Sequence, residues 1–563
     1  NPPHPSSTTI SWSVIMNSEK LDSVIIETTT GPIRGYIDDE NDTKYYKFKK
    51  IPFAKPPLGP LRFLPPAPVV SWTEVLDCTH DAPLPLFRYI TGNLMGSEDC
   101  LYIELSTKNL KPDKPLPVMF WIGTFMFTCH IDHLLDTSLL NDHDVIFVRC
   151  GFRVGALGFL SVNDFTAPGN CGLKDIVMAL KWIQNNIDKF GGDPNNITLF
   201  GSGSGSSIVH LMMLSPMASG LFHKAILQSS TALNNWSLTK NPSQSVVDLA
   251  KKLGITKSLH FEIVEELRSL PAEQLMSASS DLQDELFFPD WNTLDACFKP
   301  CIENDLEGLP AFLTKSPILI LRSGNFNKVP VIIGSNYMEG SFINFLPKDV
   351  YSDYQKYNDD ISLIVPRSLS CDKKLTKVIA LKLLDFYFVG ERTLSEKTQT
   401  QFIQFISDYF FLYYVNKTVR LHSDVAPECP IFYYILNCAG EWNVPQNSSY
   451  LNNLEIPFLF GIKSDDSQVC KGSRDSVKTR SRVIKMWTNF AKYGNPTPED
   501  DPLLQIEWES VKSDEKLNYL SIGTELTKGR NPFQERMEFW DNLHKEYTFQ
   551  RMLSYFNDLG VTW

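Results

Sequence analysis

Short apolar runs without strict alternation recur along the chain and predict a buried sheet. Each run is four or five residues long and is rich in β-branched, aromatic or other apolar residues. Continuous runs of this kind are typical of strands that are covered on both faces, as in a largely parallel sheet. We therefore expect strands over residues 118–122, 145–148, 197–200, 225–228, 329–333 and 432–435.

A helix is predicted between two of these strands. Its apolar residues recur at steps of three and four and so share one helical face, and Gly191-Gly192 ends the pattern. Alternation of strands and helices indicates an α/β protein with helices on both faces of the sheet. Residues 1–20, rich in Pro, Ser and Thr, are interpreted as a linker or stalk, and residues 21–563 as one domain. The apolar helical positions are Leu173, Ile176, Leu180, Ile183, Ile187 and Phe190.

The strand at 197–200 runs directly into Gly-Ser-Gly-Ser-Gly and then into an apolar helix. Strand, sharp turn and helix is the setting in which G-x-S-x-G presents a nucleophilic serine. In the natural register the nucleophile position is Gly203, and neither Ser202 nor Ser204 is centred between two correctly spaced glycines. The sequence therefore predicts a nucleophile elbow without a nucleophile.

Composition and charge narrow the function classes. The chain has 563 residues, of which 43% are hydrophobic, and carries a formal net charge of −12. A chain of this length can bury a large core, and its net negative charge argues against a nucleic-acid partner. Neither a His/Cys cluster with zinc spacing nor a complete calcium loop is present in the sequence, so no metal or other cofactor is expected.

Cysteines and glycosylation motifs point to an extracellular origin. There are 11 cysteines, an odd number, so at least one is unpaired or pairs with another chain. Acceptor motifs for N-linked glycans occur at several asparagines, and the motif at Asn196 adjoins the elbow strand and is the least accessible. The predicted glycosylation sites are Asn41, Asn235, Asn416 and Asn447.

Several motifs in fixed order resemble the type-B carboxylesterase/cholinesterase family, over about residues 24 to 556. This resemblance implies an α/β-hydrolase fold with a large, mostly parallel central sheet and a deep gorge. It also implies a disulfide between Cys78 and Cys100, the family's first pair. The motifs that carry the resemblance lie at residues 50–63, 96–102, 152–161, 172–175, 190–201 and 486–492.

The family's catalytic triad of Ser, Glu and His is incomplete in this sequence. The nucleophile position is Gly203, the acid is retained as Glu339, and the base position holds Asn452. An amide cannot take a serine proton near neutral pH as an imidazole does. The glycine-rich oxyanion loop corresponds to the segment that begins at Gly123, which is shortened by about two residues and keeps one glycine.

These losses together predict a pseudoenzyme, with Glu339 kept for structural reasons. After Glu339 the histidines are His422 and His544, and both are interpreted as structural or surface residues. Two alternatives stay open: a residual esterase that uses Ser202 or Ser204, and a secreted binder of small apolar ligands in the former gorge.

Within the family, the inactive members that the chain resembles are extracellular adhesion proteins: neurotactin above all, and also glutactin, gliotactin and the neuroligins. The resemblance implies an ectodomain on the outer face of the plasma membrane, tethered outside this chain and active in neural adhesion. It implies an extracellular protein ligand, with immunoglobulin-domain adhesion proteins among the candidates.

A C-terminal helix with an apolar stripe is predicted from residue 533 onward. The stripe either packs on the body or, as in the family's dimers, joins a second helix from residues 375–388 to form a homodimer interface. The stripe residues are Phe533, Met537, Trp540, Leu543 and Tyr547.

Overall fold

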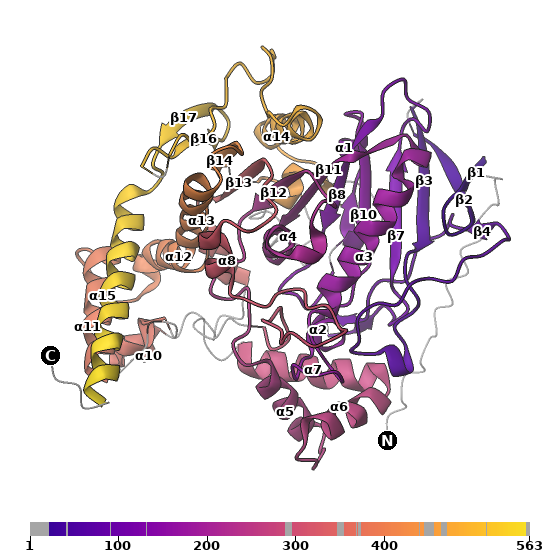
Figure 1. The fold of residues 1–563 in the computed structure, drawn as a ribbon. Coiled ribbons are helices and arrows are strands. Elements are labelled where there is room, and N and C mark those ends of the chain that lie inside the picture. The colour runs from indigo at the N-terminus through magenta and orange to yellow at the C-terminus, as the bar shows by residue number, and fades with distance from the viewer. Residues whose placement is uncertain are drawn as a thin grey trace, which may run out of the picture.

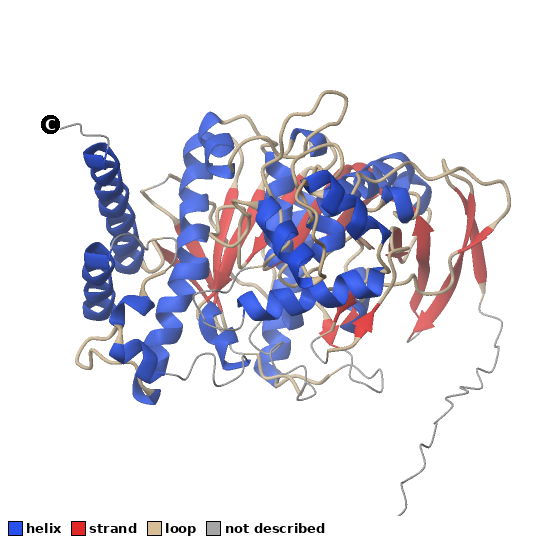
Figure 2. Ribbon diagram, turned by 90° about the horizontal axis from the view of Figure 1, so that it is seen from below, coloured by secondary structure: helices blue, strands red, loops and turns tan. Residues whose placement is uncertain are grey.

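A large twisted mixed sheet runs through the molecule, with helices on both of its faces (Figures 1 and 2). The computed structural model describes residues 22–40, 43–89, 92–130, 132–287, 296–345, 354–366, 369, 373–438, 440–443, 455–462, 470–513 and 515–558. The sheet has 13 strands in the order β1-β2-β3-β7-β10-β8-β11-β12-β13-β14-β16-β17, with β4 paired to β2. The pairings from β10 to β16 are parallel, and the principal outer pairings are antiparallel.

The strands of the main sheet have the following bounds: β1 (Ser23–Glu27), β2 (Pro32–Glu40), β3 (Thr43–Pro52), β4 (Leu76–Asp77), β7 (Tyr102–Thr107), β8 (Leu116–Ile122), β10 (Ile146–Cys150), β11 (Gly192–Ser202), β12 (Lys224–Gln228), β13 (Val331–Asn336), β14 (Ile431–Leu436), β16 (Asn518–Ile522) and β17 (Leu526–Arg530). Two small separate sheets pair β5 (Phe87–Arg88) with β6 (Leu94–Met95) and β9 (Leu135–Asp136) with β15 (Gly461–Ile462).

The α-helices are α1 (Ser138–Asn141), α2 (Gly155–Phe159), α3 (Cys171–Asn186), α4 (Ser204–Leu214), α5 (Pro242–Lys252), α6 (His260–Ser269), α7 (Ala272–Phe287), α8 (Pro317–Ser323), α10 (Tyr354–Asp359), α11 (Lys373–Tyr387), α12 (Gln399–Ser407), α13 (Tyr413–Val425), α14 (Arg474–Tyr493) and α15 (Gln534–Asp558). A single π-helical turn, Asp408–Leu412, joins α12 to α13.

The two faces of the sheet have separate hydrophobic cores, and β8 shows how one strand supplies both. Val118 and Phe120 belong to the core that contains α3 and α4, whereas Met119 and Trp121 belong to the core that contains α14. Because successive side chains of a strand point to opposite faces, a continuous apolar run is what a strand covered on both sides requires. The predicted fold class and each of the six predicted strands are confirmed.

The predicted helix corresponds to α3 and the 3-10 turn Ile187–Phe190 that follows it, and all six apolar stripe positions are buried. The α-helix itself ends at Asn186, and the turn ends where the pattern does, at Gly191, which adopts a left-handed φ of 82°. The chain then reverses into β11, the strand that leads to the elbow.

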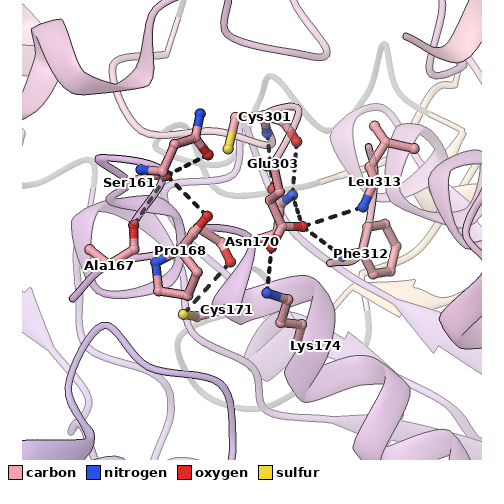
Figure 3. Close-up of polar contacts among 12 residues, drawn as sticks. Ser161, Ala167, Pro168, Asn170, Cys171, Lys174, Cys301, Glu303, Phe312 and Leu313 are labelled. Atoms are coloured by element: carbon pink, nitrogen blue, oxygen red, sulfur yellow. Dashed lines mark hydrogen bonds and ion pairs between the residues drawn. The ribbon is translucent and has the colours of Figure 1, made fainter. Parts of the chain in front are cut away.

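A buried ion pair ties the N-terminal turn of α3 to the loop after residue 296 (Figure 3). Lys174 contacts the Glu303 carboxylate, and both side chains are 2% exposed. The amide of Phe312 and Nδ2 of Asn170 also donate to Glu303 Oε2, at 2.7 and 2.8 Å. A buried carboxylate with this many donors is satisfied, whereas the removal of Lys174 would leave a buried charge uncompensated.

The C-terminal stripe packs on the body of the same chain. Met537, Trp540 and Leu543 are 5%, 0% and 4% exposed. Trp540 Nε1 donates to Tyr387 Oη at 2.7 Å, and the ring of Phe539 stacks on Phe386 of α11 at 4.0 Å. Figures 1 and 2 both show α15 beside α11. Of the two readings of the stripe, the structure therefore supports packing within the chain.

The structure leaves the predicted disulfide open and bears on one of the predicted glycosylation sites. Cys78 and Cys100 are buried free thiols, and Cys78 Sγ lies 3.1 Å from the Lys50 carbonyl oxygen, so their disulfide stays a prediction. Asn416 is 4% exposed and lies on the face of α13 that meets Tyr433, and a glycan is incompatible with that packing. This corrects the prediction at Asn416.

The remaining glycan predictions are untested. Asn235 is half-buried in a turn, and Asn41 and Asn447 lie outside the described residues, as does the 1–20 linker. Among the described helices, none is both long enough and apolar enough to cross a membrane.

Candidate functional site

The elbow between β11 and α4 is formed as predicted, with Gly203 at its apex. Gly203 has φ 56° and ψ −124°, a backbone conformation that side-chain-bearing residues rarely adopt. Its amide donates to the Gln228 carbonyl at 2.9 Å, and its carbonyl accepts from the Ser207 amide at 3.0 Å. A Cβ at Gly203 would meet no atom within 4 Å, so space for a side chain exists at the apex.

Close packing behind the apex explains a second glycine of the run. A Cβ at Gly205 would lie 2.1 Å from the Ile122 carbonyl oxygen at the end of β8. The helix can therefore approach the strand only without a side chain at this position.

The two neighbouring serines are not placed as nucleophiles. Ser204 is 5% exposed, and its hydroxyl donates to the Thr124 carbonyl at 2.9 Å. Ser202 Oγ lies 3.5 Å from Glu455 Oε2, at the outer limit of a hydrogen bond. Among the described residues, no histidine forms a hydrogen bond with either hydroxyl.

The segment in the oxyanion-loop position is a tight hairpin closed on itself. The amide of Phe125 donates to the Cys129 carbonyl at 2.9 Å, and the amide of Thr128 donates back to Phe125 at 3.0 Å. Met126 and Phe127 at its tip both have left-handed φ, 55° and 62°. Backbone amides that donate hydrogen bonds within a turn are not aimed at a developing oxyanion.

Phe127 extends from this hairpin into the aromatic core beside the elbow. Its ring is 1% exposed and lies 5.9 Å from the ring of Phe159 and 6.3 Å from that of Trp236. Trp236 in turn contacts Phe411 at 5.9 Å. A side chain of the shortened loop therefore occupies space next to the elbow.

Glu339, at the acid position, is 6% exposed at the end of β13. Its Oε1 accepts from the Asn336 amide at 2.7 Å, and its Oε2 accepts from Asn336 Nδ2 at 3.2 Å. Burial raises the pKa of Glu339 above its ordinary value. These local bonds hold the carboxyl group in the core without any histidine.

A second buried carboxyl group, Glu455, lies beside Glu339. Its Oε1 accepts from the Tyr434 hydroxyl at 2.5 Å, and its Oε2 accepts from the Ser229 hydroxyl at 2.9 Å. The Ser229 hydroxyl also lowers the pKa of Glu339, so one hydroxyl acts on both carboxyl groups. Burial first, and then the charge of Glu339, raise the pKa of Glu455. Two carboxyl groups so close cannot both ionise without mutual repulsion.

Sequence reasoning missed the role of Glu455 and Ser229. The signal was present: a single acidic residue interrupts the apolar run from Leu454 to Phe460. A carboxyl group in such a run is seldom buried without a specific partner. The base position Asn452 lies outside the described residues, whereas Gly203 and Glu339 are brought together by the segment Gln228 to Ser230.

Of the two downstream histidines, His422 is buried and His544 is half-buried, in agreement with their structural interpretation. His422 Nε2 lies 3.0 Å from His210 Nε2, and His210 Nδ1 accepts from the Ala232 amide at 3.0 Å. His210 therefore carries its proton on Nε2 and donates it to His422. His544 stacks on Tyr413 at 4.9 Å. Burial lowers the pKa of His422 and of His544 to about 4.

The parallel sheet and its strand–turn–helix elbow define an α/β-hydrolase fold. The carboxylesterase family model matches residues 22–540, and the chain belongs to this family. A solved structure of juvenile hormone esterase from Manduca sexta, with OTFP covalently attached, has a TM-score of 0.78 and 25% identity. The match covers 93% of this chain and 100% of the esterase chain.

Curated relatives include both esterases and neuroligins. Juvenile hormone esterase of Tribolium castaneum is 30% identical over 95% of this chain and 95% of its own length. Venom carboxylesterase-6 of Apis mellifera is 32% identical over 88% of this chain and 90% of its own. Human neuroligin-2 is 28% identical over 93% of this chain and 68% of its own length. The names of the relatives alone do not decide between these functions.

We expect Gly203→Ala to lower the free energy of unfolding by about 1 kcal/mol, because alanine pays the cost of the left-handed φ and meets no crowding. Urea denaturation measures this change in the free energy of unfolding. Gly220→Ala is the matched control, since Gly220 also has positive φ, 74°, and no atom within 4 Å of a Cβ. A higher midpoint for Gly203→Ala than for the wild type would contradict this account.

Glu455 links stability to pH. Its pKa is raised from 4.5 to about 8 in the folded state, so the folded chain holds a proton that the unfolded chain releases. The stability contributed by this proton is complete below about pH 4.5 and is lost as pH rises toward 8.

We expect Glu455→Gln to flatten this dependence, so that its melting temperature gains on that of the wild type between pH 5 and pH 8. Differential scanning calorimetry at several pH values measures the effect. Glu499→Gln, at an exposed position, is the control and should run parallel to the wild type. Parallel curves for Glu455→Gln as well would show that this carboxyl group is ionised in the folded chain.

Proposed function

We propose that this chain is a non-catalytic extracellular ectodomain that binds a protein partner in cell adhesion. The observation that carries the proposal is Gly203, the residue without a hydroxyl at the apex of a correctly formed elbow. Without an Oγ at this position the acyl-enzyme of serine hydrolysis cannot form there. The self-bonded Phe125–Cys129 hairpin and the amide at position 452 support the same conclusion.

A protein-binding role accounts for a large fold kept without its chemistry. Fold and function are separable, and a body of this size offers broad surfaces for protein contacts. Neurotactin and the neuroligins, which the sequence resembles, supply the model: an ectodomain tethered at the outer face of the plasma membrane. The partner would be an extracellular protein, with immunoglobulin-domain adhesion proteins as the first to test, in a neural setting.

We expect no serine hydrolysis. The purified chain is incubated with a fluorescent fluorophosphonate and with short-chain nitrophenyl esters, beside Gly203→Ser, Ser202→Ala and Ser204→Ala variants. Wild type should show neither stoichiometric labelling nor a burst. Gly203→Ser should gain little esterase activity, because position 452 is Asn rather than His and the hairpin amides donate within the hairpin.

Stoichiometric labelling that disappears in Ser202→Ala or Ser204→Ala would replace this proposal with a residual esterase. The adhesion arm is tested separately: beads coated with the chain should cluster with cells that display the partner and not with cells that lack it. Absence of such binding across a panel of extracellular adhesion proteins would count against adhesion even if hydrolysis is absent.

We also propose association of two copies beside the C-terminal helix. The original stripe is buried within the chain, but Val378 and Leu381 on the neighbouring α11 are 41% and 43% exposed. Two tethered copies that associate would gain avidity for a partner without any new type of contact.

We expect a dimer at micromolar concentration by sedimentation velocity, and a shift to monomer in Leu381→Glu. Burying a charge in an apolar contact is costly, which is the reason for the shift. Leu319→Glu is the matched control, because Leu319 is 57% exposed on α8. A wild-type chain that stays monomeric would remove this part of the proposal.

A further inference from the structure

The last two strands form an antiparallel hairpin that ends the sheet. β16 pairs with β14 on one side and with β17 on the other, and β17 pairs with β16 alone. Figure 1 shows β17 at the outer margin, next to the start of α15. In the described part of the chain, no strand pairs with the outer edge of β17.

The register fixes which backbone groups point outward from this edge. The Asn531 amide donates to the Leu517 carbonyl at 2.9 Å, and the Ile522 carbonyl accepts from Asn437, beyond β14, at 2.7 Å. Since hydrogen-bonded pairs alternate along an antiparallel ladder, Gly529 bonds toward β16. The amides and carbonyls of Lys528 and Arg530 therefore point away from the sheet.

The two faces of the hairpin differ. On one face the Tyr519 ring lies across Gly529, where a Cβ would come within 2.3 Å of the ring. On the other face the exposed Lys528 stands opposite the buried Leu520, and the exposed Arg530 stands opposite the buried Asn518. A cavity of about 180 Å³, lined also by Trp508 and Glu509, lies between them.

Positive charge gathers at this edge although the whole chain carries −12. Lys528 Nζ donates to Glu509 Oε1 at 2.9 Å, and the charges of Lys528, Lys512 and Arg530 all lower the pKa of Glu509. Three cations thus face one carboxylate. Among the described residues, no ion pair to Arg530 is present, and its side chain is exposed.

We propose that the β17 edge docks an extended acidic segment of a partner protein, which adds to the sheet as a further strand. The outward groups of Lys528 and Arg530 supply its backbone hydrogen bonds. Acidic residues two apart in that segment would stand beside the exposed side chains of Lys528 and Arg530, since residues i and i+2 of a strand share a face. The 180 Å³ cavity has room for a side chain.

A second copy of this chain is a poorer occupant of the edge. Pairing β17 with another β17 would set Lys528 and Arg530 against the same cations, and like charges across a strand pair are destabilising. Charged edge residues also protect sheets from such self-pairing. The charges at this edge therefore disfavour pairing with a second copy of β17 and favour pairing with an acidic strand. This inference goes beyond the proposed function and does not depend on the chemistry at Gly203.

The test uses the purified full chain and a labelled, end-capped octapeptide that alternates Glu with Val, with a Lys-Val octapeptide as the charge control. Fluorescence anisotropy at low salt should detect binding of the acidic peptide, weakened at least tenfold by Arg530→Glu. Lys111→Glu, an exposed cation elsewhere, should change binding less than twofold. Hydrogen exchange should show the Lys528 and Arg530 amides protected by the peptide.

Two variants at one position separate strand addition from charge attraction. Lys528→Gln removes the charge and keeps the outward amide, whereas Lys528→Pro removes both and leaves the β16 ladder unbroken. Lys528→Pro should bind at least fivefold more weakly than Lys528→Gln. If Lys528→Pro unfolds the hairpin, protection of the Lys528 and Arg530 amides in the wild type decides between strand addition and charge attraction.

Three results would overturn the proposal: equal binding by the two Lys528 variants, binding without amide protection, or no preference for the acidic peptide over the basic one. Self-association of the wild type that Lys528→Pro abolishes would also overturn it, in favour of a second copy.

Discussion

The backbone at residue 203 is the constraint on which the centre of this structure depends. β11 must leave a parallel sheet and enter α4 within a single residue, and the chain does so with a left-handed φ of 56° and ψ of −124°. In an active elbow a serine bears the cost of that conformation. Here glycine adopts it freely, so the turn serves as a joint between strand and helix.

Two buried carboxyl groups lie beside this joint, and each is held by hydrogen bonds from its neighbours. Glu339 is held by Asn336 and Ser229, and Glu455 by Tyr434 and Ser229, so their hydrogen bonds do not need a histidine. Their raised pKa values favour at least one shared proton near neutral pH. A pair of carboxyl groups that shares a proton in this way is satisfied as part of the core.

Much of the fold and part of the site could be predicted because they depend on local pattern. Doubly buried strands and α3 are visible as apolar periodicity, and the elbow as a strand followed by alternating glycines. β17 could not be found this way, since Leu-Thr-Lys-Gly-Arg at a sheet edge has no apolar run. The Glu339–Glu455 pair unites residues far apart in sequence, and the left-handed tip at Met126 and Phe127 breaks ordinary turn preferences.

The elbow and the outer edge of β17 lie at separate places in the fold, because β11 is a central strand of the sheet and β17 is its last. Serine hydrolysis would need a hydroxyl, a base and free amides to converge at Gly203, where the apex is glycine and the nearest loop bonds to itself. Recognition of another protein needs only an outward surface with unused donors, acceptors and charge, as at the far edge of the same sheet. Because the sheet is one continuous hydrogen-bonded body from β1 to β17, its rigidity serves either use. The glycine at the apex of the elbow therefore leaves intact the sheet whose outer edge we propose as a binding surface.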